Sequence, residues 1–212
     1  MTQRTFGIFD VDTRQTRNTG GWTYMARTQP YRDDIKGLLA AARLHHVPTI
    51  ATTCVGGHMR DEHPFSMVHP DTLFVPMLGG DGTWWSRVDT FDSFFVEKKP
   101  RRSRQGITPG DDSWQIFRNN PNAARLIDRL DLDEWVVFGN AMDICGDLVV
   151  THFLEQGRTV RYIPELMIPG AACIGCEPKF FKQHVYDRWH AHGVEPISLA
   201  DVLARTALDL TA

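Results

Sequence analysis

The segment from Trp135 to Leu154 constrains the fold of this chain more than any other part of the sequence. It begins with four apolar residues, WVVF, which are typical of a buried strand. The turn GNAMDIC follows, and from Gly146 onward apolar residues recur at helical spacing. We therefore expect a strand, a turn and a helix in succession, with Cys145 in the turn near the helix N-terminus.

Strand-like and helix-like segments alternate along the rest of the chain. We predict strands at residues 5–9, 48–53, 94–97, 135–138, 159–163 and 194–197, and helices at residues 31–46, 120–130, 143–156, 178–190 and after Ser198. This alternation predicts an α/β fold, a three-layer α/β/α sandwich with a mostly parallel central sheet. With 212 residues, 42% of them hydrophobic, we expect a single domain over residues 1–212. Residues 55–92 form a long irregular span, typical of a functional loop.

Three of the predicted strands run into residues that can do chemistry, namely Asp10, Lys98 with Lys99, and Cys145. Sites in open α/β sheets gather at the carboxyl ends of the strands. A helix N-terminus stabilises a thiolate, and the thiolate is the nucleophile in covalent catalysis. Taken singly, Cys145 could be a small core residue and Asp10 a cap, but the combination favours catalysis.

These residues also carry a resemblance to a known family. The order Asp, Lys, Cys resembles that of the isochorismatase-like cysteine hydrolases, which include nicotinamidases, N-carbamoylsarcosine amidases and ureidoacrylate hydrolases. Members have a Gly-x-Ala-Thr-Asp-x-Cys turn, which reads GNAMDIC here with Met in place of Thr. They have a Lys four residues before a Ser, as Lys99 precedes Ser103, and a first strand ending in Asp-Met-Gln or similar, which reads DVD from Asp10.

The resemblance implies an Asp-Lys-Cys triad that hydrolyses the C–N bond of a small amide or ureido substrate through a thioester. Cys145 would attack the carbonyl carbon, Asp10 would transfer the protons, and Lys99 would keep both ionised. The backbone N–H groups of Ala141 and Cys145 would form the oxyanion hole, and the peptide bond between Asn140 and Ala141 would be cis. Two alternatives stay open: a vinyl-ether hydrolase of the isochorismatase type, and a non-catalytic protein that binds a small molecule.

Lys98 and Lys99 compete for the same role, because successive side chains of a strand point to opposite faces. The spacing to Ser103 favours Lys99.

The resemblance does not extend to a metal site. Some members hold a metal with Asp-x-His after the second strand, but the sequence CVG stands at that place here. We therefore expect no metal and no cofactor. A rebuilt site from Cys54 and three loop histidines, His58, His63 and His69, stays open as an alternative.

The sequence also limits the partners. A net charge of −3 and the absence of an apolar run of ~20 residues predict neither nucleic-acid nor membrane binding. The basic run KKPRRSR at residues 98–104 instead fits a site mouth for a small, carboxylate-bearing substrate, with plain solvated charge as the alternative. We expect a cytoplasmic protein, since no signal peptide opens the chain and four cysteines do not form a disulfide framework. We also expect a homo-oligomer.

Two further motifs have more than one interpretation. Trp84 and Trp85 fit either a pocket wall or an oligomer contact. Cys173 and Cys176 form a CxxC in a predicted loop rich in Pro and Gly, where we expect neither a zinc site nor a redox pair.

Overall fold

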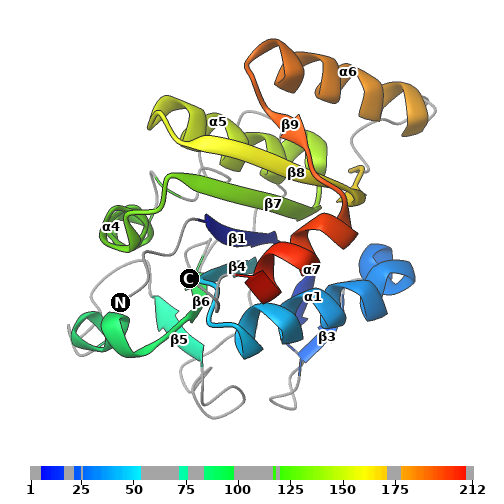
Figure 1. Cartoon of the computed structure of the whole chain (residues 1–212). Helices are drawn as coiled ribbons and strands as arrows, with labels where there is room; N and C mark the ends of the chain where they lie inside the picture. Colours follow the sequence, from blue (N-terminus) through cyan, green and yellow to red (C-terminus); the bar gives the residue numbers. More distant parts are fainter. Residues whose placement is uncertain are drawn as a thin grey trace, which may run out of the picture.

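The structure is a computed structural model that describes residues 6–16, 22–24, 26–53, 72–75, 84–97, 117, 120–170 and 178–208. Figure 1 shows a central sheet with helices on both of its faces. The predicted α/β/α sandwich is therefore confirmed.

The central sheet has seven strands in the order β5-β6-β4-β1-β7-β8-β9, and every neighbouring pair is parallel. In chain order the strands are β1 (Phe6–Val11), β4 (Thr49–Thr53), β5 (Thr72–Val75), β6 (Ser93–Glu97), β7 (Glu134–Asn140), β8 (Thr159–Ile168) and β9 (Glu195–Pro196). A separate antiparallel pair consists of β2 (Arg14–Thr16) and β3 (Trp22–Tyr24). β1 lies at the middle of the sheet, with β4, β6 and β5 on one side and β7, β8 and β9 on the other.

The helices are α1 (Arg32–Leu44), α4 (Pro121–Leu130), α5 (Asp147–Glu155), α6 (Pro178–Ala191) and α7 (Leu199–Leu208). Short 3-10 turns cover Ala26–Tyr31 (η1) and Trp85–Thr90 (η2), and a single π-helical turn, η4, covers Met142–Gly146. Helices α1 and α7 pack against each other, as Figure 1 shows, while α5 and α6 are joined by hydrogen bonds from Arg188 and Trp189 to Asp147.

The alternation of side chains along β1 assigns the two faces of the sheet. The Phe9 ring lies 5.5 Å from that of Phe153 on α5, centroid to centroid. On the other face, the Arg205 guanidinium of α7 lies 4.3 Å from the centroid of the Phe6 ring. Because side chains two residues apart share a face, Asp10 belongs to the face of Phe6 and α7.

Two helix starts agree with their sequence signals. The Asn120 side chain accepts hydrogen bonds from the backbone N–H groups of Asn122 and Ala123, which caps α4 ahead of Pro121. The Ser198 hydroxyl accepts a hydrogen bond from the Asp201 N–H at the start of α7. Each side chain satisfies N–H groups that the first helical turn leaves unpaired.

Other boundaries differ from the sequence prediction. Residues 55–92 are not wholly irregular, because they include the edge strand β5 and the turn η2. Within this span Trp84 is buried in the core, with its ring edge-on to that of Trp85. Strand β8 runs past Pro164 to Ile168, and a bulge between Val137 and Gly139 absorbs the shift in register.

At position 139 the backbone conformation and the neighbouring strand both require glycine. The φ of Gly139 is +124°, and a Cβ built there would lie 2.2 Å from the carbonyl oxygen of Val11 on β1. A side chain would therefore clash with the backbone of the neighbouring strand in a conformation that L-residues avoid.

We predict that Gly139→Ala lowers the free energy of unfolding by about 3 kcal/mol or more, because backbone strain adds to overpacking. Gly157→Ala is the matched control, since Gly157 also has positive φ, at +71°, but a Cβ there would meet nothing within 4 Å. The control should lose only about 1–2 kcal/mol. Urea denaturation of both variants measures the difference, and equal losses would show that the contact with Val11 is unimportant.

Candidate functional site

The site is built where β1 and β7 end side by side. The two strands are parallel, and Asp10 pairs in register with Phe138. Five residues separate Asn140, the last residue of β7, from Gly146, and Cys145 lies within this turn. The sheet thus brings the segments that carry Asp10 and Cys145 to the same edge, although 134 residues lie between them in the sequence.

Cys145 sits in a tightly bonded turn. Its side chain is buried, with 2% exposed, and forms no disulfide. Ile144 and Gly146 are the two neighbours of Cys145 in the chain. Their backbone N–H groups donate hydrogen bonds to the Ala141 carbonyl, at 3.1 and 2.9 Å. The backbone around the thiol is therefore fixed, and α5 begins two residues later.

The peptide bond between Asn140 and Ala141, which leads into this turn, is cis. Both residues are buried. In the same turn, an Asp143 carboxylate oxygen accepts a hydrogen bond from the backbone N–H of Gly170, just beyond the end of β8. A Cβ on Gly170 would lie 2.6 Å from that oxygen, so this contact requires glycine. Asp143 consequently ties the Cys145 turn to the next strand.

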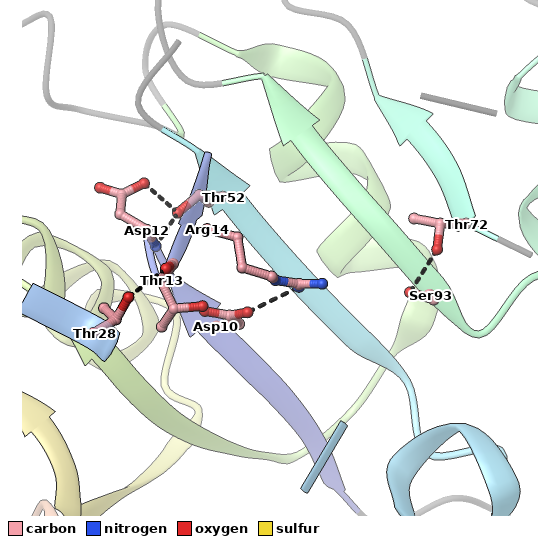
Figure 2. A network of polar contacts seen from close by, with 8 residues as sticks. All are labelled: Asp10, Asp12, Thr13, Arg14, Thr28, Thr52, Thr72 and Ser93. Carbon is pink, nitrogen blue, oxygen red and sulfur yellow. Dashed lines mark hydrogen bonds and ion pairs between the residues drawn. The ribbon is translucent and has the colours of Figure 1, made fainter. Parts of the chain in front are cut away.

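Asp10 is a buried carboxylate whose two oxygens differ in their hydrogen bonding. Oδ2 accepts a hydrogen bond from Nη2 of Arg14 at 2.9 Å, as Figure 2 shows. Oδ1 is buried and has no hydrogen-bond partner among the described residues. Burial raises the pKa of Asp10, and Arg14 opposes that rise by favouring the charged form. A carboxylate with a raised pKa can exchange a proton with a substrate or a thiol near neutral pH.

A second set of contacts fixes the chain where it leaves β1. The Thr52 hydroxyl of β4 donates to the Asp12 carboxylate at 2.9 Å and accepts from the Asp12 N–H at 3.2 Å. The Thr28 hydroxyl donates to the carbonyl of Thr13. Figure 2 shows these contacts next to Asp10 and Arg14. They hold the bend through Asp12, whose φ is +50°, and thereby aim Arg14 back over the sheet.

Sequence reasoning missed Arg14. It lies four residues after Asp10, on β2 and outside the predicted strand, and no motif marks it. The available signal was a cation close in sequence to a carboxylate at the end of a predicted strand.

Several predicted residues fall outside the described part of the chain. These are Lys98, Lys99, Ser103, Cys54, His58, His63, His69, Cys173 and Cys176. Strand β6, which leads to the two lysines, ends at Glu97 and is separated from β1 by β4 alone. Within the described ranges, no three His, Cys, Asp or Glu side chains are grouped as a metal site would require.

Comparisons with known proteins bear on the fold. No family model matches the sequence, and no curated protein matches it. Solved structures do match. A cysteine hydrolase from Pseudomonas syringae pv. phaseolicola is similar with a TM-score of 0.61 and 15% identity, over 99% of this chain and 95% of that one.

Two further solved structures are similar over most of this chain. The nicotinamidase from Staphylococcus aureus has a TM-score of 0.55 and 12% identity, over 92% of this chain and 98% of its own. The YcaC gene product from Escherichia coli, an octameric hydrolase of unknown specificity, has a TM-score of 0.55 and 11% identity, over 96% of this chain and 79% of its own. Isochorismatase-family proteins are also among the matches.

The raised pKa of Asp10 predicts a specific pH dependence of stability. A folded-state pKa above the unfolded value stabilises the fold at low pH, and that contribution is lost as the pH rises from about 4 through the folded-state pKa. The difference in unfolding free energy, wild type minus Asp10→Asn, should therefore fall as the pH rises. Urea denaturation at pH 5, 6.5 and 8 measures it, and a difference that grows with pH would mean that Asp10 has a lowered pKa.

The architecture, a parallel seven-stranded sheet with helices on both faces, is the isochorismatase-like α/β fold.

Proposed function

We propose that this chain is a cysteine hydrolase that cleaves the C–N bond of a small amide or ureido substrate through a thioester on Cys145. The observation that supports it best is the pairing of β1 with β7, which brings buried Asp10 and the buried thiol turn to one edge of the sheet. The structural similarity to a cysteine hydrolase and to a nicotinamidase agrees with this chemistry.

In the proposed first half-reaction, Asp10 accepts the thiol proton and the thiolate of Cys145 attacks the carbonyl carbon. The backbone N–H groups of Ala141 and Cys145 donate to the oxyanion that forms. The C–N bond then breaks, Asp10 returns its proton to the leaving amine, and an acyl thioester remains on the sulfur.

In the second half-reaction, Asp10 takes a proton from water, and the resulting hydroxide attacks the thioester carbonyl. The C–S bond breaks, the carboxylic or carbamic acid leaves, and the thiol recovers its proton. Lys99 is the member of the triad that would stabilise the ionised forms of Asp10 and Cys145 by its charge.

The raised pKa of Asp10 suits both halves, because one group must accept a proton and then give it back. A vinyl-ether hydrolase would also use Asp10 as a proton donor but would not need a nucleophile at position 145. The two reactions therefore differ in their dependence on Cys145.

We also propose that the substrate carries a carboxylate, which the basic run at residues 98–104 would attract, and that the protein works as a homo-oligomer. The octameric state of the similar YcaC gene product supports the second point. No described helix has the length and apolar character that crossing a membrane requires.

Cys145→Ala should abolish turnover, with a loss of at least ~10⁴-fold, because the nucleophile cannot be replaced by its neighbours. The measurement is ammonia release from nicotinamide, carbamoyl amino acids, biuret and maleamate, with thermal unfolding to check that the fold survives. Cys54→Ala and Cys176→Ala are matched controls and should keep at least roughly a tenth of the wild-type rate. Undiminished ammonia release by Cys145→Ala would rule out the thioester, and turnover of a vinyl ether alone would favour the alternative.

A further inference from the structure

We propose that Arg14 is the positioning residue of Asp10, holding its Oδ2 so that Oδ1 is left to exchange the proton with Cys145. This inference rests on the proposed function of Asp10 as the acid and base. It adds a charged residue from β2 to the site, beside the Asp-Lys-Cys set that the sequence resemblance implies.

The geometry of the pair is that of a buried ion pair. Nη2 of Arg14 lies 2.9 Å from Oδ2 of Asp10, and their side chains are 15% and 1% exposed. In so little water, a charge-assisted hydrogen bond is stronger than at the surface and fixes the carboxylate plane. Oδ1 is then held in one orientation, and this buried oxygen has no hydrogen-bond partner among the described residues. That oxygen is the one available for a proton.

The guanidinium is itself held in place from the sheet side. The Arg14 Cζ lies 5.1 Å from the centroid of the Phe95 ring on β6. Phe95 pairs in register with Ala51, which pairs in register with Asp10, so the three side chains belong to one row across the sheet. A guanidinium over an aromatic face is attracted by the ring and keeps its hydrogen-bonding edge directed sideways, here toward Asp10.

Among the described residues around Asp10, Arg14 is the cation that lowers its pKa. On the neighbouring strands the residues in register are Ala51 and Phe138, which are neutral. Burial raises the pKa of Asp10 the most and Asp12 adds to the rise, whereas Arg14 opposes it. Without Arg14, the carboxyl group would stay protonated to higher pH and would be a poorer acceptor of the thiol proton.

A cavity gives access to Arg14 from outside the sheet. Its volume is about 490 Å³, and Arg14 forms part of its wall together with Arg43, Thr49 and Ser93. Removal of the Arg14 side chain would therefore leave a space that a small cation can enter from solvent. This permits a test in which the missing guanidinium is supplied as a free ion.

The first experiment measures the titration of the Asp10 carboxyl group by carbon-13 NMR, which needs no turnover. In Arg14→Gln the titration should move to higher pH, and in Arg14→Lys, which keeps the charge, it should stay near that of the wild type. If the Asp10 titration is the same in Arg14→Gln as in the wild type, the inference is overturned.

The second experiment uses turnover. In Arg14→Gln the acid limb of the pH profile of kcat/KM should move to higher pH, as the Asp10 titration does. The rate at pH 6.5 should fall at least ~10-fold, which is less than the full contribution of a general base. In Arg14→Ala, millimolar guanidinium should restore part of the lost rate. Arg43→Ala is the matched control, because Arg43 carries an equal charge in the wall of the same cavity but is not among the groups that shift the pKa of Asp10. Guanidinium should not change the rate of this variant.

The outcomes separate the two proposals. If the wild type hydrolyses no substrate and Cys145 resists alkylation, the proposed function fails, while the NMR titration still decides whether Arg14 governs Asp10. If the wild type is active but Arg14→Gln keeps its rate and its acid limb, Arg14 has no positioning role. A rate loss without any shift of the titration would mean that Arg14 acts only through the stability of the fold.

Discussion

The parallel pairing of β1 with β7 is the constraint on which the rest of the structure depends. Both strands are buried on both faces, so their register cannot slip without moving polar atoms into the apolar core. This register sets Asp10 opposite Phe138 and Val11 opposite Gly139. Gly139 in turn lets the two backbones approach closely before the chain enters the Cys145 turn. The chemistry proposed for the edge of the sheet is therefore a consequence of how its centre is packed.

Burial of Asp10 is costly, and among the described residues Arg14 is the cation that offsets part of the cost. A carboxylate removed from water favours its protonated form, which the raised pKa of Asp10 reflects. Arg14 restores part of the preference for the charged form. A carboxylate held between these two influences is suited to proton exchange near neutral pH. The burial of Asp10 therefore agrees with the proton-transfer role proposed for it.

Local signals in the sequence were sufficient for much of the fold. The alternation of strands and helices depends on residues close in the chain, and the structure has it as predicted. The caps at Asn120 and Ser198 are local in the same way. The edge strand β5 and the continuation of β8 through Pro164 depend on pairing with distant strands, which no local pattern reveals. The link between Arg14 and Asp10 was hidden for a related reason, because it depends on the bend that follows β1 and on the Phe95 ring of β6.

If Asp10 and Cys145 act as one catalytic unit, the alkylation of the thiol should depend on the carboxylate. The rate of iodoacetamide addition to Cys145, followed by peptide mass spectrometry from pH 5 to 9, should differ between the wild type and Asp10→Asn. Loss of Asp10 should slow the addition at neutral pH and change the shape of the profile, because the thiol loses its proton acceptor. Identical profiles for the two proteins would contradict this coupling, since the thiol would then be independent of the carboxylate.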